Sequence, residues 1–278
     1  MNYNNKMNLE TFDINLHEEK IYSQNGEDGI LEFIFSKIGT TNKFSVEFGV
    51  GNGFECNTVY LLEKKGWTGL MMDYGADQKV KWTSVLNKAW SNRKLGLKDN
   101  LKKDVTFLKK IVKQKERTTQ FQPDIKNERI TAENIQDLFQ KYHVPKKFDL
   151  LSIDIDYNDY WVWKSIVDYF PRVVIIEYNS SIPPSESRVV PYDSDAEWDG
   201  TNYFGASLLA LQNLGMRKGY TLVGCDHNGV NAFFCQSNLL TEFKIKDIVD
   251  LYMPPKYGDL INDIHIGHPK SDREMIEI

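Results

Sequence analysis

Cysteine is scarce in this chain, and long apolar runs and a surplus of positive charge are missing. Three cysteines among 278 residues are too few for a disulfide framework, so reduced thiols are expected. No stretch approaches the roughly 18 consecutive apolar residues that a membrane span needs. Residues 1–8 also lack the apolar segment of a secretory signal. These absences predict a cytoplasmic protein without a membrane span.

The charge balance argues against a nucleic-acid partner. Lys and Arg total 34 against 39 Asp and Glu, which gives a formal net charge of −5, whereas nucleic-acid binding favours a basic surplus. What the chain does contain is core material, since 41% of its residues are hydrophobic and 13% are aromatic. The length suits one large α/β domain, and a small-molecule ligand is the more reasonable expectation.

Strand and helix patterns alternate along the chain. A helix that begins near Ser23 or Asn25 and stops before Gly39 is followed by a βαβ unit, with strands at 44–48 and 68–73 around a helix that ends at Gly66. Residues 75–128 are Lys-rich and are interpreted as a helical insertion. The remaining predicted elements are a short strand at 129–130, a helix at 131–142, strands at 148–154 and 172–177 around a helix at 158–169, a helix at 205–214, a hairpin of strands at 220–224 and 231–235, and a helical pattern at 239–251.

This alternation requires a mostly parallel sheet with helices on both faces. We predict a single domain over residues 1–278, with a core at about 20–238, an insertion at about 75–128 and a C-terminal extension at about 239–278. Ligands of such sheets bind at the carboxyl ends of the strands. Polar residues gather at those ends, namely Glu47, glycines 49, 51 and 53, Asp73, Asp154, Glu177 and the turn at 226–228. A functional site is therefore expected at that edge.

The glycines at 49, 51 and 53 follow a predicted strand and depart from the dinucleotide-binding fingerprint. That fingerprint requires its third glycine at position 54, which is Phe54 here. Glu47 would repel a diphosphate beside the turn, whereas a cationic ligand with an amino group and a ribose would be attracted by Glu47 and Asp73. S-adenosylmethionine is such a ligand. A tight structural turn without any ligand is the alternative.

Three segments carry a resemblance to a known family: SQNGEDGIL at 23–31, VEFGVGNG at 46–53 and NTVYLLEKKGWTG at 57–69. In order and spacing they resemble the FkbM-type S-adenosylmethionine-dependent methyltransferases, in which Asp often stands at the position of Glu47. The resemblance is good over 23–73, recognisable over 148–179, and poor in the insertion and the tail. It implies a Rossmann-like class I methyltransferase fold, with a mostly parallel seven-stranded sheet and a terminal antiparallel hairpin. It also implies S-adenosylmethionine as cofactor, bound by Gly49, Gly51, Asn52, Gly53 and Asp73 and lined by Gln24 and Asn57.

Acids also follow two further strands that are expected to be neighbours. Residues 154–159 hold three carboxylates, and Glu177 ends the next strand. Neighbouring strands lie about 4.8 Å apart, so these acids can reach one Mg²⁺ or Mn²⁺ ion. The arrangement resembles metal-dependent O-methyltransferases of the macrocin type, which implies Asp154 and Glu177 as ligands with Asp156 and Asn179 as alternates. In the alternative interpretation Asp156 or Asn158 caps a helix and Asp154 holds the amino group of the cofactor.

A base is needed to deprotonate the acceptor during methyl transfer. His227 lies in the turn of the predicted hairpin, at the carboxyl edge of the sheet, and Asp156 is the competing candidate. The other four histidines, at positions 17, 143, 265 and 268, have no partner in the sequence pattern.

Together these inferences predict an S-adenosylmethionine-dependent O-methyltransferase that acts on a hydroxyl of a sugar or sugar nucleotide. Its setting would be glycan biosynthesis, such as that of a capsule or surface polysaccharide, or natural-product biosynthesis. Two alternatives stay open: a nucleotide-dependent oxidoreductase on the same fold, and a non-catalytic binding module. The expected partner is a small-molecule or glycan acceptor, and a homo-oligomer is left open.

Overall fold

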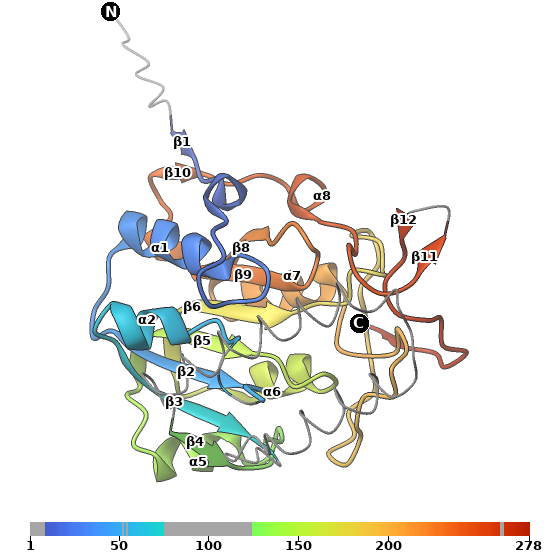
Figure 1. Cartoon of the computed structure of the whole chain (residues 1–278), viewed down its shortest axis with the longest axis horizontal. Coiled ribbons are helices and arrows are strands. Elements are labelled where there is room, and N and C mark those ends of the chain that lie inside the picture. The colour runs from blue at the N-terminus through green and yellow to red at the C-terminus, as the bar shows by residue number, and fades with distance from the viewer. Residues whose placement is uncertain (1–8, 52, 54, 75–123, 262–263) are drawn as a thin grey trace, which may run out of the picture.

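The computed structural model describes residues 9–51, 53, 55–74, 124–261 and 264–278, and its centre is a seven-stranded sheet (Figure 1). The strand order is β4-β3-β2-β5-β6-β9-β8. Its strands are β2 (Phe44–Phe48), β3 (Thr68–Asp73), β4 (Ile125–Asn127), β5 (Lys147–Ile153), β6 (Phe170–Glu177), β8 (Tyr220–Cys225) and β9 (Asn231–Gln236). The first five are parallel, and β9 runs antiparallel between β6 and β8. The predicted α/β architecture, a mostly parallel seven-stranded sheet with a terminal antiparallel hairpin, is confirmed.

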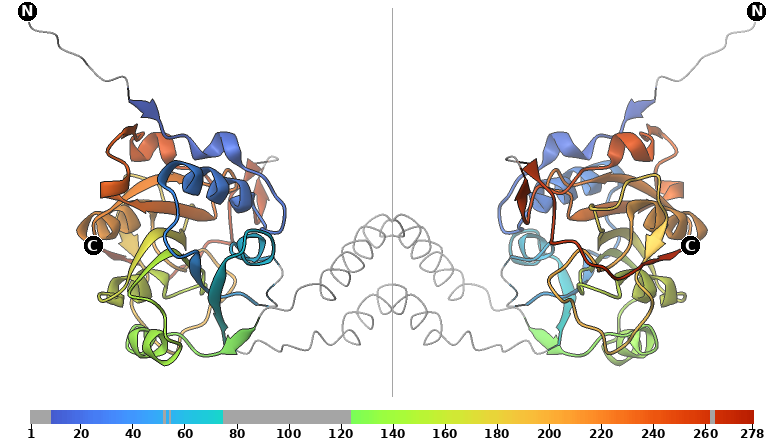
Figure 2. Two further views of the ribbon diagram at one scale, coloured as in Figure 1. Left: turned by 90° about the vertical axis from the view of Figure 1, so that its left-hand side faces the viewer. Right: turned by 90° about the vertical axis from the view of Figure 1, so that its right-hand side faces the viewer.

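Helices cover both faces of the sheet (Figures 1 and 2). The period of two in β6 sends Val173 and Ile175 to the face covered by α1 (Glu27–Ile38) and α2 (Val59–Lys64), where they pack with Ile30 and Leu61. Val174 and Ile176 point to the opposite face, which is covered by α5 (Ile135–Lys141), α6 (Asp159–Ser165) and α7 (Leu208–Arg217). Central strands that are buried on both faces explain the continuous apolar runs in the sequence.

The chain reverses its direction of winding at β2, which lies between β3 and β5. Successive strands proceed from β2 toward β4 on one side and from β5 toward β8 on the other. Such a switch point leaves a crevice at the carboxyl ends of the two central strands, because the connections there diverge. Gly49 follows β2 and Asp154 follows β5, so both residues lie at this crevice.

Several predicted boundaries are wrong. The short strand expected at 129–130 is β4 at Ile125–Asn127, so the insertion cannot extend to residue 128. The helix expected at 158–169 ends at Ser165, because the chain turns to bury Ile166 and Tyr169 before β6 begins. The helix predicted from residue 205 begins at Leu208 as α7. Ser207 is its N-cap, because its side chain accepts the N–H of Ala210. The helix proposed within the insertion lies outside the described residues.

The C-terminal extension forms mainly short strands, and the helical pattern predicted at 239–251 yields only a short helix. Among the described residues of the extension, α8 (Ile248–Leu251) alone is α-helical, after the 3₁₀ turn η3 (Ser237–Leu239) and β10 (Phe243–Lys244), which pairs with β1 (Glu10–Thr11). Backbone pairing with distant segments overrides the local helical pattern. The last pieces are the hairpin of β11 (Leu260–Ile261) and β12 (Ile264–His265), and β13 (Ile276–Glu277), which pairs with β7 (Arg188–Val189).

The extension returns to the carboxyl edge of the sheet. In Figure 1 the arrows of β2 and β3 point toward the side of the molecule where β11 and β12 lie. Two hydrogen bonds join the extension to Asn202. The N–H of Asn202 donates to the carbonyl of Pro269 at 2.9 Å, and the N–H of Ser271 donates to the Asn202 side-chain oxygen at 2.8 Å. The extension therefore lies beside the crevice instead of trailing away from it.

The three cysteines are buried and free. The hairpin register pairs Cys225 with Ala232 and Cys235 with Thr221, so the two cysteines do not face each other. None of the described helices is long and apolar enough to cross a lipid bilayer.

Candidate active site at the carboxyl ends of the strands

Two adjoining cavities open at the switch point, and Gly49 lines both of them. The larger has a volume of about 430 Å³ and is lined by residues that follow β2, β3, β4 and β5 and by the loop at 194–198. The smaller has a volume of about 300 Å³ and lies between the glycine turn, the loop before α1 and the β8–β9 hairpin. Together the cavities gather residues from sequence positions more than 200 residues apart.

Gly49 cannot carry a side chain at this position. Its φ of 68° lies in the left-handed region, and a Cβ atom would sit 1.3 Å from the carbonyl oxygen of Asp154. The loops after β2 and β5 are thus in direct backbone contact. This close approach gives a physical reason for the first glycine of the turn.

Glu47 connects the end of β2 with the start of α2 by hydrogen bonds. Its buried carboxylate accepts the N–H of Asn57 at 2.7 Å, the N–H of Thr58 at 3.0 Å and the Thr58 hydroxyl, which ties β2 to the start of α2. Burial raises the pKa of Glu47 to about 7, although these donors favour the ionised form. Glu47 also lines the smaller cavity, so a cofactor role stays a prediction beside this structural one.

Asp73 stabilises the glycine turn by a hydrogen bond from Gly51. Its carboxylate accepts the N–H of Gly51 at 2.7 Å and lines the larger cavity. Burial raises the pKa of Asp73, and the charge of Asp156 adds to the effect. Gly53 closes the turn by donating its N–H to the carbonyl of Val50 and lines neither cavity. Asn52 lies outside the described residues.

The loop before α1 and the start of α2 supply amides to the smaller cavity. Gln24 and Asn57 both line it, and the Asn57 amide donates to the Ser152 hydroxyl at 3.0 Å. Asn25 lines it too, and its backbone N–H donates to Glu27 at 2.7 Å, while Glu27 also accepts from the Asn231 amide. The structure therefore brings together the polar ends of two sequence segments that the resemblance singled out.

The charge of both cavities is predominantly negative. The charged side chains that line the smaller cavity are Glu27, Glu47, Glu55 and Asp154, and those that line the larger are Asp73, Glu128, Asp156, Glu197 and Arg129. Arg129 is thus the sole basic side chain among the described residues of both linings. It is held in place, because it donates to the carbonyl of Ser194 at 2.8 Å. Such a site favours a cationic ligand over a diphosphate.

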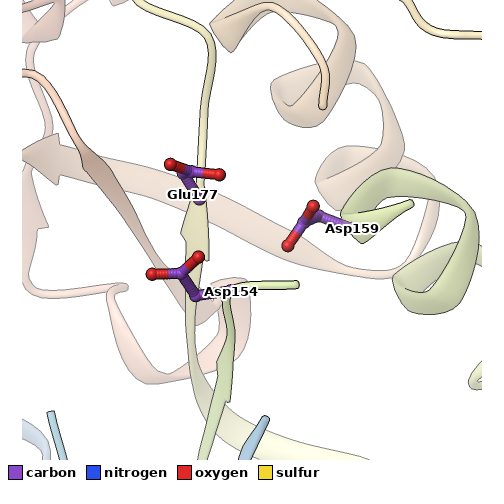
Figure 3. Close-up of side chains that lie close together, drawn as sticks. All are labelled: Asp154, Asp159 and Glu177. Atoms are coloured by element: carbon purple, nitrogen blue, oxygen red, sulfur yellow. The ribbon is translucent and has the colours of Figure 1, made fainter. Parts of the chain in front are cut away.

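Three carboxylates converge beside these cavities, and one of them was not among the predicted metal ligands. Oxygen atoms of Asp154, Asp159 and Glu177 all lie within 4.8 Å of one another (Figure 3). Asp154 follows β5, Asp159 opens α6 and Glu177 ends β6, so the sheet and the helix bring them together. In Figure 3 the Asp159 side chain points from its helix toward the other two acids.

Two oxygens of this group have no hydrogen-bond partner among the described residues. Asp159 is 1% exposed, and its Oδ1 accepts the N–H of Ile155 at 2.9 Å while its Oδ2 is left unpaired. Glu177 leaves its buried Oε2 unpaired as well. Burial raises the pKa of all three carboxyls, that of Asp159 to about 7, and the neighbouring acids raise those of Asp154 and Glu177 further. Either protons or a cation must compensate the charge here.

The alternate metal ligands Asn179 and Asp156 do not belong to this group. The Asn179 amide donates to the carbonyls of Asn202 and Phe204, and its oxygen accepts the N–H of Ser181, so its side chain is committed to the loop after β6. Asp156 lines the larger cavity with a φ of 64°. The sequence did contain a signal for Asp159, because it is the third acid of residues 154–159 and lies at the start of a predicted helix.

The structure does not bring His227 to the other site residues. Its Nδ1 pairs with Glu18 at 2.8 Å, its side chain is 46% exposed, and it lines neither cavity. The expectation that His268 lacks partners is wrong, because its ring lies 4.5 Å from that of Trp198, which lines the larger cavity. No local pattern signalled this contact, since it joins two loops 70 residues apart.

No protein-family model and no curated protein sequence matches the chain. A similar solved structure is that of an S-adenosylmethionine-dependent methyltransferase from Clostridium acetobutylicum ATCC 824, with 10% sequence identity and a TM-score of 0.37. The similarity covers 78% of this chain and 92% of that one. A likeness at this level does not establish a shared function.

Proposed function

We propose that this chain is an S-adenosylmethionine-dependent O-methyltransferase. The observation that carries the proposal is the pair of cavities that share Gly49, walled by a glycine turn and by carboxylates with Arg129 as their sole basic side chain among the described residues. This donor carries a positive sulfonium and an amino group, so an acidic site attracts it. The same acids would repel the diphosphate of a dinucleotide, which argues against the oxidoreductase alternative.

The residues suggest how the two ends of the donor would be held. The Asp73 carboxylate lines the larger cavity, where it can accept hydrogen bonds from ribose hydroxyls. Asp154 and Glu27 line the smaller cavity, which suits the positive amino group. The donor, when bound, supplies an electrophilic methyl carbon. The chain must then align the acceptor in line with the departing sulfur, accept its proton and keep water away.

A divalent cation at Asp154, Asp159 and Glu177 is a second part of the proposal. Oxygen ligands of Mg²⁺ lie about 2.1 Å from the ion, so two of them on opposite sides are about 4.2 Å apart. Carboxylate oxygens within 4.8 Å of one another suit such a site after small adjustments. A cation would also neutralise the unpaired Oδ2 of Asp159 and Oε2 of Glu177. Its chemistry would be to lower the pKa of a coordinated acceptor oxygen.

The acceptor proposed is a hydroxyl of a sugar or sugar nucleotide, in glycan or natural-product biosynthesis. Support comes from the resemblance to FkbM-type enzymes and from the larger cavity, which combines the ring of Trp198 with Glu197 and Asp156. An aromatic face beside carboxylates suits a polyhydroxylated ring, because the ring packs on the apolar face while its hydroxyls donate to the acids.

Calorimetric titration of the purified protein with S-adenosylmethionine and, separately, with NAD tests this function. We expect S-adenosylmethionine to bind and NAD at about 1 mM to give no signal. Asp73→Asn should weaken the binding of S-adenosylmethionine about tenfold, because it removes a charge-assisted hydrogen bond. The exposed Asp137→Asn on α5 is the control and should bind normally. Binding of NAD without binding of S-adenosylmethionine would refute the proposal.

A further inference from the structure

The C-terminal extension places one histidine against Trp198, an aromatic residue that lines the larger cavity. The ring of His268 lies 4.5 Å from Trp198, 5.1 Å from Tyr257 and 5.8 Å from Phe204, measured between ring centroids. Trp198 itself lines the cavity. Three aromatic rings therefore fix the position of the imidazole, which stays partly exposed.

The charged surroundings of His268 suit a proton acceptor. Asp156, which lines the same cavity, and Asp259 are the acids whose charges act on it, and Tyr257 is the titratable ring in contact. Burial lowers the pKa of His268, and the two acids partly offset this effect. The imidazole is therefore neutral at pH 7 and can accept a proton, while Asp156 stabilises the resulting imidazolium.

The ring nitrogens of His268 are uncommitted. Among the described residues, none forms a hydrogen bond with them. By contrast, the Nδ1 of His227 pairs with Glu18, and His17 is stacked on Phe33 with ring centroids 4.0 Å apart. His268 thus combines a fixed ring, a free nitrogen and a place beside the cavity.

We propose that His268 is the catalytic base that takes the proton of the acceptor hydroxyl, and that the charge of Asp156 stabilises the imidazolium that forms. This inference rests on the proposed methyl transfer. As the acceptor oxygen forms its bond to the methyl carbon, the carbon–sulfur bond breaks and its electron pair stays on sulfur, which becomes a neutral thioether. The hydroxyl proton moves to a free nitrogen of His268 and then leaves to solvent from the partly exposed ring.

The test compares His268→Gln with His265→Gln, an exposed histidine three residues earlier in the same extension. Both variants are first titrated with S-adenosylmethionine, and both should bind it as the unmodified protein does. They are then assayed with methyl-labelled S-adenosylmethionine on nucleotide sugars and methyl glycosides, and on a matched set of amines and carboxylic acids. For hydroxyl acceptors we expect kcat to fall about 100-fold or more in His268→Gln, with loss of the acidic limb of its pH profile, and no change in His265→Gln.

A second readout needs no substrate. The Cε1–H signal of His268 is followed by NMR as pH is varied, and Asp156→Asn should lower the pH at which this signal titrates. Unchanged kcat in His268→Gln, an unchanged titration in Asp156→Asn, or methylation by the unmodified protein of amines and acids alone or of no compound would each overturn the inference. Failure to bind S-adenosylmethionine would instead refute the proposed function, and with it this step.

Discussion

Asp226, in the turn after β8, illustrates how single acids are held in this protein. Its side chain is fully buried and accepts the N–H groups of Asn228 at 2.8 Å, Val230 at 3.2 Å and Asn231. These donors shape the hairpin turn, yet burial raises the pKa of Asp226 to about 7. The carboxylate therefore organises the backbone at some cost in desolvation.

The raised pKa of Asp226 predicts a pH-dependent stability. In the unfolded chain the group titrates near 3.8, so between about pH 4 and pH 7 the folded state binds more protons than the unfolded one. The free energy of unfolding should consequently fall as pH rises through this window, by at most about 2 kcal/mol from pH 5.5 to 7.5 for this group.

Urea unfolding at both pH values measures this slope in the unmodified protein and in Asp226→Asn. The variant should show the smaller pH dependence, whatever its absolute stability. An equal slope in the two proteins would show that Asp226 does not titrate in this range.

Among the elements, the turn between β2 and α2 depends most on backbone shape. Gly49 and Gly51 both have positive φ, of 68° and 51°. They differ in their surroundings, because a Cβ on Gly49 would collide with the carbonyl of Asp154, whereas one on Gly51 would meet no atom within 4 Å among those described. The two glycines are therefore required for different reasons.

Alanine substitution separates the two reasons. Gly49→Ala should destabilise the protein by about 3 kcal/mol or more, because the loops after β2 and β5 must move apart. Gly51→Ala should cost only about 1 kcal/mol, the price of a left-handed conformation. Denaturant unfolding of both variants provides the measurement, and similar losses would contradict the contact between the two loops.

On the scale of the whole molecule, the fold brings three buried or partly buried carboxylates together. Asp154, Asp159 and Glu177 come from three different elements, and the parallel pairing of β5 with β6 brings two of them together. No single element contains all three acids, so the repulsion between their like charges arises only when the sheet and α6 are assembled. A cation that binds only the folded state would stabilise the entire domain.

Thermal unfolding with and without Mn²⁺ tests the cation site. At ten times its dissociation constant the ion should raise Tm by roughly 2 to 3 °C. Asp159→Asn should abolish this rise, while its own metal-free Tm stays equal to or above that of the unmodified protein because one buried charge is gone. The exposed Asp168→Asn serves as the control and should respond like the unmodified protein. A rise that persists in Asp159→Asn would exclude this site.

Local patterns were sufficient for the core of the fold. The strands at 44–48 and 68–73 are predicted to the residue, because Phe44, Val46 and Phe48 alternate along the first and residues 70–72 form a short apolar run in the second. The same patterns place Gly49, Asp73 and Asp154 at one edge of the sheet, since the carboxyl ends of parallel strands must share an edge.

Other features depend on contacts that no local pattern encodes. The short strands of the C-terminal extension form because β10 pairs with β1 and β13 with β7, and each pairing joins segments far apart in sequence. The Asn179 side chain is held away from the carboxylate group by its bonds to the loop at 202–204, and the direction of α6 brings Asp159 into that group.

What the sequence by itself determined is the order of strands and helices and the residue types at their ends, because these follow from period and composition along the chain. The tertiary structure alone decided which acids converge, that the Cβ of residue 49 has no room, and that His268 lies beside Trp198. These depend on distances between chain segments, which hydrophobic burial and strand pairing set only when the whole domain is assembled.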